Sequence, residues 1–169
     1  DEHTLRAVEA AERFDKDAGP VGSSYRALRS KSLLHLALLL HDLGKGFEID
    51  HSDVGKLIAE ATARRLYLSD EQRDTLAFLV HKHLMMAHLA FRRDFTQPET
   101  LMEFIRQVGS AERLRMLYVL TAADMSAVGP GVWTEWKSEV LTDLFDRATA
   151  TNVPIEQRIR QIVLNLERR

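Results

Sequence analysis

The sequence of 169 residues contains no cysteine. Disulfide bonds and thiolate chemistry are therefore excluded, and the composition is compatible with a reducing compartment, so we expect a cytoplasmic protein. A long hydrophobic run is lacking too. The most apolar stretch, residues 33–40, is interrupted by His35 and is far shorter than the roughly 20 residues that a membrane-spanning helix needs. We expect no association with a membrane.

A strong charge imbalance is also missing. The formal net charge is −2, and no long basic run occurs, so there is no electrostatic case for binding nucleic acid. Apolar residues make up 45% of the chain, which is enough for a real core. The length favours a single domain over residues 1–169. Because the chain begins without methionine, we interpret it as an excerpt of a longer protein.

Strand-like alternation and internal repeats are absent, and helical periodicity dominates. Ser69 and Gln72 form a capping-box pattern, and Pro98 suits the first turn of a helix. We predict an all-α fold, a bundle of roughly seven helices with loops at 15–24 and 87–97. The expected helices cover approximately 1–14, 31–43, 52–68, 69 to 83–86, 98–109, 110–128, 132–150 and, after Pro154, 155–167.

Ionisable residues fall at places that should be buried. The apolar stretch "LLHLALLL" ends in His41 and Asp42, and Asp124 is in line with Leu117 and Thr121 at helical spacing. An unpaired buried carboxylate costs several kcal/mol or takes up a proton. Four histidines and two aspartates form this group, and we expect several of them to point inward. They are His3, His41, Asp42, His51, His83 and Asp124.

A metal ion accounts for these six residues, because carboxylates and imidazoles are tolerated in a core when they coordinate a cation. Asp42 has two oxygens and could bridge two ions. Taken one at a time, such residues are more often hydrogen-bonded groups of the core, and we interpret His35 and His88 in that way. Asp124 alone could be a buried hydrogen-bonding group between helices. The complete set favours a metal site.

The motif "HDLGK" followed by "DHSDVG" resembles the HD superfamily of metal-dependent phosphohydrolases. The order of "DEHTLR", "LLLHDLGKG", "DHSDVG", "LVHKHLMM", "RRD" and "YVLTAADMSAVGPGVWTEWK" is similar to the central HD domain of bifunctional uridylyltransferase/uridylyl-removing enzymes, over about residues 1–148. Where that family commonly has a His-His pair, this chain has Lys82-His83.

The resemblance implies the following assignment. His3, His41, Asp42 and Asp124 would hold a first divalent ion, and His51 and His83 a second, with Asp42 between them. Lys45 would act catalytically, by stabilising the developing phosphate charge or protonating the leaving oxygen. Arg92 and Arg93 could bind phosphate. The metal would be Mn²⁺, Mg²⁺ or Fe²⁺. Imidazole-rich ligation suits transition metals, and the resemblance to the family also allows Mg²⁺.

The implied substrate is a PII-type signalling protein that carries UMP, and the implied products are UMP and free PII. Flanking nucleotidyltransferase and ligand-sensing domains would belong to the full-length chain. Two alternatives stay open. The first is an HD phosphohydrolase that acts on free nucleotides or cyclic dinucleotides, and the second is a regulatory HD domain without turnover.

Overall fold

The computed structural model describes residues 2–45 and 51–167, and the side chains of residues 2–45 and 52–151. Within these ranges the chain forms nine α-helices and one short 3₁₀ turn, η1, and no strand. The prediction of an all-α fold is confirmed. The helices are α1 (Glu2–Arg13), α2 (Pro20–Arg26), α3 (Lys31–Leu40), α4 (His51–Arg65), α5 (Asp70–His81), α6 (Met85–Arg92), α7 (Pro98–Val108), α8 (Ala111–Val128) and α9 (Glu135–Glu167).

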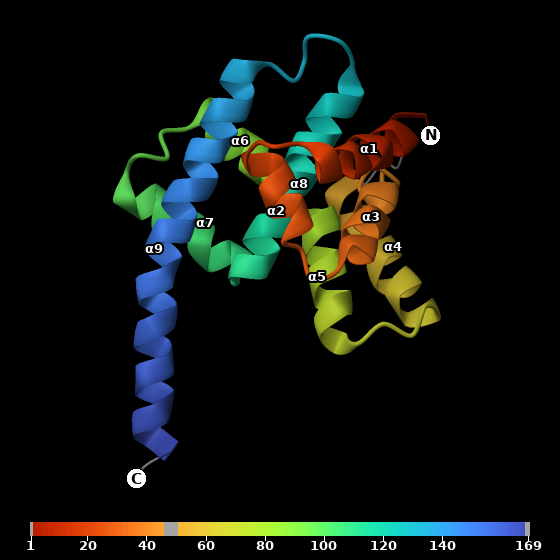
Figure 1. The fold of residues 1–169 in the computed structure, drawn as a ribbon. Coiled ribbons are helices and arrows are strands. Elements are labelled where there is room, and N and C mark those ends of the chain that lie inside the picture. Colours follow the sequence, from red (N-terminus) through yellow and green to blue (C-terminus); the bar gives the residue numbers. More distant parts are fainter. Residues whose placement is uncertain (1, 46–50, 168–169) are drawn as a thin grey trace.

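Helix α8 lies at the centre of the bundle (Figure 1). It contacts α1, α2, α3, α5, α6, α7 and α9. Its apolar side chains are buried on nearly every side, including Leu117, Leu120 and Ala123, as expected for a helix that is surrounded by others. Ser110 caps its first turn by accepting a hydrogen bond from the amide of Arg113. A polar residue on α8 is therefore delivered to the interior.

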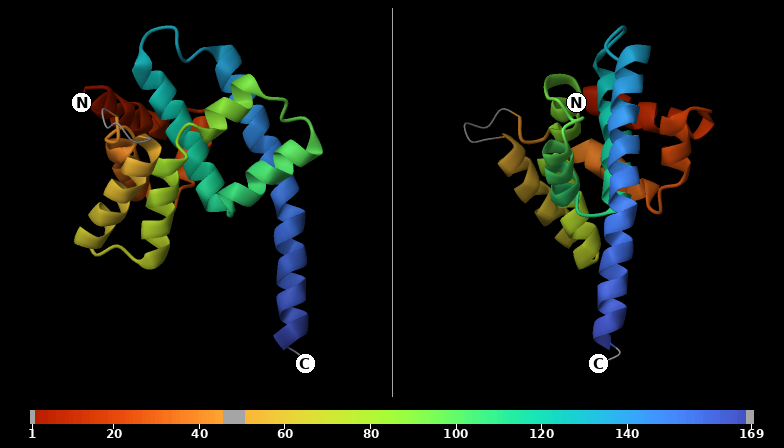
Figure 2. Two further views of the ribbon diagram at one scale, coloured as in Figure 1. Left: turned by 180° about the vertical axis from the view of Figure 1, so that it is seen from behind. Right: turned by 90° about the vertical axis from the view of Figure 1, so that its left-hand side faces the viewer.

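The other helices divide around α8. Helices α1, α3, α4 and α5 gather on one side, and α6, α7 and α9 lie on the other (Figures 1 and 2). Helix α9 continues well past the rest of the bundle in all the views. None of the described helices has the combination of length and apolar content that crossing a bilayer requires.

Two of the expected loops contain helices. Within 15–24 the helix α2 begins at Pro20, which occupies the first turn, where its missing N–H costs nothing. Within 87–97 the helix α6 buries Met86, Leu89 and Ala90, which follow helical spacing. The prediction of two C-terminal helices was also wrong, because α9 runs through Pro154 as one helix.

Candidate metal centre

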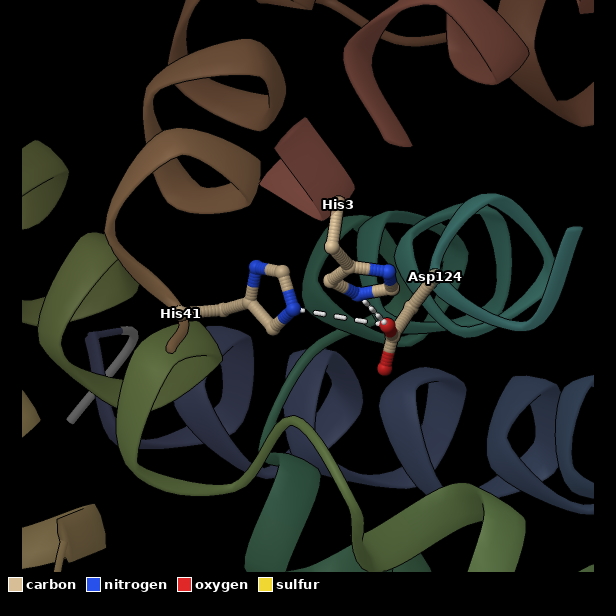
Figure 3. Close-up of side chains that lie close together, drawn as sticks. All are labelled: His3, His41 and Asp124. Atoms are coloured by element: carbon tan, nitrogen blue, oxygen red, sulfur yellow. Dashed lines mark hydrogen bonds and ion pairs between the residues drawn. The ribbon is translucent and has the colours of Figure 1, made fainter. Parts of the chain in front are cut away.

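Three segments that are distant in the sequence bring their polar side chains together. His3 lies in the first turn of α1, His41 directly follows α3, and Asp124 lies near the end of α8. Helix α1 packs against both α3 and α8, and this packing places the three side chains side by side (Figure 3). One ligand atom from each lies within 4.8 Å of the other two, which is close enough for all three to bind one ion.

Asp124 is the shared partner of the two histidines. Its Oδ1 atom lies 2.8 Å from Nε2 of His3 and 3.3 Å from Nε2 of His41. Oδ2 of Asp42 lies 3.5 Å from the same nitrogen of His41 and 3.8 Å from Nε2 of His3. All four residues that were predicted for a first metal therefore lie together.

The end of α3 orients the ring of His41. The last carbonyl groups of a helix lack intrahelical partners, and the Nδ1 atom of His41 donates to one of them, the carbonyl of Leu38, at 2.7 Å. The proton on Nδ1 leaves Nε2 with a lone pair in the neutral ring. This Nε2 atom is buried without a hydrogen-bond partner. The lone pair and the two carboxylate oxygens repel one another, and a cation or a proton between them relieves this repulsion.

His83 is oriented in the same way. Its Nδ1 atom donates to the carbonyl of Val80 at 2.7 Å, and its ring is buried, 5.2 Å from that of His41 between centroids. We expected the helix to end around residues 83–86, but α5 ends at His81 and Lys82 is its C-cap. The turn that follows, and not helical periodicity, points His83 inward. In metal sites, a histidine ligand commonly donates the N–H of its second ring nitrogen to a backbone carbonyl.

Asp42 divides its oxygens between the two groups of histidines. Oδ2 faces His3 and His41, whereas Oδ1 lies 3.9 Å from Nε2 of His83. The carboxylate of Asp42 is almost fully buried, with a side-chain exposure of 7%. This division is the geometry that a carboxylate between two ions would need.

The charges of the centre shift its pKa values. Burial lowers the pKa of His41, but its contact with Asp124 and the negative charges of Asp124 and Asp42 outweigh burial and raise it above the ordinary value. Burial raises the pKa of Asp124, but His41 and His3 together lower it below its usual range. For His83, burial is the main cause of a lowered pKa, and the charge of His41 adds to it. His83 is thus held neutral, as ligation requires.

Lys45 lies at the exposed side of this centre. Its Nζ atom donates to Oδ2 of Asp42 at 2.6 Å, and its side chain is 62% exposed. The turn between them is fixed by a hydrogen bond from the amide of Lys45 to the carbonyl of Asp42. A cation in this position can reach a substrate that approaches from solvent.

The remaining predicted residues lie in different settings. Arg92 ends α6 and Arg93 follows it, and both are exposed. His51 begins α4, but its side chain lies outside the described residues. The Nε2 atom of His35 forms a hydrogen bond of 3.0 Å with the hydroxyl of Tyr25, in line with its interpretation as a hydrogen-bonded residue. His88 is exposed, so its interpretation as a core residue was wrong.

The donor set fits a divalent ion. Within the described part of the chain, two imidazole nitrogens and one carboxylate oxygen converge, and Asp42 lies beside them with a buried carboxylate. The Nε2 atom of His41 is the strongest sign, because it is buried without a hydrogen bond, 3.3 Å from Asp124, where an apolar side chain of similar volume would be more stable. The sequence did not identify the carbonyls of Leu38 and Val80 as the partners of His41 and His83. The one available signal was the position of each histidine just beyond the end of a helix.

Comparisons with known proteins agree with this centre. Residues 1–124 match the HD domain, a range that includes His3, His41 and Asp124. The chain is 41% identical over 86% of its length to a bifunctional uridylyltransferase/uridylyl-removing enzyme of Zymomonas mobilis. It is 39% identical over 96% of its length to one of Azospirillum brasilense. The chain spans only 16% and 18% of the length of these two relatives.

Proposed function

The chain belongs to the HD domain family, and from this premise we propose that it is a metal-dependent phosphohydrolase. The observation that carries the proposal is the convergence of His3, His41, Asp42 and Asp124 from three separate segments of the fold. These residues would hold a first divalent ion. His83 and Oδ1 of Asp42 face a second position, where His51 would be a further ligand. Mn²⁺, Mg²⁺ or Fe²⁺ would suit this set.

A bound divalent ion supplies a low pKa for coordinated water and neutralises charge at phosphorus. The side chains of the chain do the rest. Asp124 contacts the imidazoles of His3 and His41, and the backbone carbonyls of Leu38 and Val80 fix the tautomers of His41 and His83. Lys45 would neutralise charge that develops on the phosphate or protonate the leaving oxygen. Arg92 and Arg93 would hold phosphate oxygens.

We further propose that the substrate is a PII-type protein that carries UMP, with UMP and the free protein as products. The support comes from the relatives, which are named uridylyl-removing enzymes. Because those relatives are about six times longer than the matched segment, the flanking nucleotidyltransferase and ligand-sensing domains are part of this proposal. A location in the cytoplasm, where a PII-type partner would be met, belongs to it as well.

The deciding experiment combines metal analysis with two kinds of substrate. The purified chain is assayed for bound divalent metal and then incubated with uridylylated PII and, separately, with free nucleotides and cyclic dinucleotides. Release of UMP from PII by the wild type, and none by Asp42→Ala, is the expected result. Hydrolysis of small nucleotides but not of uridylylated PII would replace the substrate. A metal-free chain without turnover would indicate a regulatory domain.

A further inference from the structure

A cavity of about 700 Å³ opens between the end of α5, helix α6 and helix α7. The α5 side contributes Lys82 and Leu84, and Arg93 lies at the end of α6. Thr100 and Gln107 line it from α7. Its size falls within the range of pockets that enclose small ligands. The four residues of the proposed first metal position do not line it: His3, His41, Asp42 and Asp124.

The cavity lies beside the turn that carries His83. Lys82 and Leu84, which line the cavity, flank His83 in one turn. The ring of His83 faces Asp42 instead. Ser52, the residue after His51, also lines the cavity. A ligand that fills the cavity would therefore lie against the turn that carries His83.

The lining combines two cations and two carboxylates with an apolar wall. Lys82 and Arg93 bring two cations, and neither forms an ion pair with any side chain in the described part of the chain. Glu103 on α7 is already bound by Arg106 and Gln107. Glu99, at the start of α7, is exposed and is the second carboxylate of the lining. The lining also contains two imidazoles, of His81 and His88, and four apolar side chains: Leu84, Met85, Leu89 and Phe104.

We infer that this cavity binds the nucleoside monophosphate part of the substrate, an inference that rests on the proposed function. Lys82 and Arg93 contact the phosphate edge, since cations without partners favour a charged acceptor. The base and ribose lie against Leu84 and Phe104, with Thr100 and Gln107 as hydrogen-bonding groups. Of the two adjacent arginines, only Arg93 lines the cavity.

The first test measures binding of UMP by calorimetry to the metal-loaded chain. We expect Arg93→Gln to weaken binding about tenfold, the effect of one lost hydrogen bond to a charged group. Arg65→Gln is the control, at an exposed arginine that ends α4 and does not line the cavity, and it should leave binding unchanged. Equal effects of the two substitutions, or no binding of UMP to the wild type, would overturn the inference.

The second test fills the cavity. Thr100→Phe adds volume to its wall. Met102→Phe places the same aromatic ring on α7, at a residue that is 42% exposed and does not line the cavity. The substrates are uridine 5′-(4-nitrophenyl phosphate) and methyl 4-nitrophenyl phosphate, which has no nucleoside. Thr100→Phe should raise KM for the uridine ester about tenfold and leave the methyl ester within about twofold, because overpacking acts locally. Met102→Phe should leave both unchanged.

These outcomes separate the two proposals. If Thr100→Phe impairs both esters equally, or neither, the cavity does not hold the nucleoside. If the metal-loaded wild type hydrolyses neither ester, the proposed function fails, and the UMP titration with Arg93→Gln still decides whether the cavity binds a nucleotide. Hydrolysis of both esters without any binding of UMP overturns the inference about the cavity alone.

Discussion

His83 faces Asp42 across 3.9 Å, from Nε2 to the Oδ1 oxygen that points away from His3 and His41. His81, two residues earlier, lies at the surface and pairs with Asp53 at 3.0 Å. A turn of the chain after α5 thus separates two nearby histidines into different environments. Only His83 has a partner that it could share with the rest of the metal centre.

His83→Ala should therefore lose one bound metal equivalent, because it removes a ligand from the second position. His81→Ala should keep the full metal content, since its imidazole is held by Asp53. Titration with Mn²⁺, followed by electron paramagnetic resonance, gives the stoichiometry of each variant. Reduced stoichiometry in His81→Ala together with full occupancy in His83→Ala would reverse the assignment.

Lys45→Ala should slow hydrolysis by roughly 10²–10³, the usual effect of removing one group that stabilises transition-state charge. The metal content should not change, because Lys45 contacts Asp42 from the exposed side and is not itself a ligand. Lys45→Arg keeps the charge and should recover part of the rate. A variant with wild-type turnover would leave Lys45 only as a cation beside a helix end.

Metal removal should lower thermal stability. In the metal-free chain the lone pair of His41 faces two carboxylates, and an ion relieves this arrangement. An ion at about 100 times its Kd contributes about 2.7 kcal/mol, which for a chain of this size corresponds to roughly 5–10 °C in Tm. Calorimetry with and without a chelator measures the shift. Asp124→Asn is the control, and a full shift in that variant would exclude Asp124 from the site.

Much of the fold could be predicted because its signals are local. The capping box of Ser69 and Gln72 is present, and Gly109, at φ 86°, ends α7 in the left-handed conformation that glycine adopts easily. Helix α2 escaped prediction because it depends on a contact. Asp17 accepts hydrogen bonds from the amides of Gly19 and Gly22, and this holds a Gly/Pro/Ser segment in a helical start.

Gly22 gives a test of that contact. A Cβ atom at Gly22 would lie 2.0 Å from the carbonyl oxygen of Asp17, so the backbone must move. Gly22→Ala should destabilise the chain by about 1–3 kcal/mol, as overpacking commonly does. Gly19→Ala is the matched control, because its Cβ would meet only the Asp17 carboxylate, at 3.3 Å. Urea denaturation compares the two, and equal stabilities would show that α2 does not depend on this close approach.

The site was predictable in composition but not in detail. Residue type and inward position indicated His3, His41, Asp42, His83 and Asp124. The orientation of the imidazoles depends on the free carbonyls of Leu38 and Val80, which have no sequence signature beyond the ends of two helices. The cavity beside His83 depends on how α6 and α7 pack, and long-range packing cannot be deduced from periodicity alone.

The raised pKa of His41 predicts how metal binding depends on pH. His41 must be neutral to bind a metal, so protons compete with the ion, and affinity should fall as pH is lowered through this raised pKa. His83, with its lowered pKa, stays neutral over the same range and should not contribute. Protonation has the opposite effect on the stability of the metal-free chain. Protonated His41 stabilises the fold below its unfolded pKa, and this contribution is lost as pH rises through the folded pKa. Calorimetric titration of Mn²⁺ at pH 8, 7 and 6, in buffers of different ionisation enthalpy, should show weaker binding and more proton release at low pH. Constant affinity without proton release would remove His41 from the ligand set.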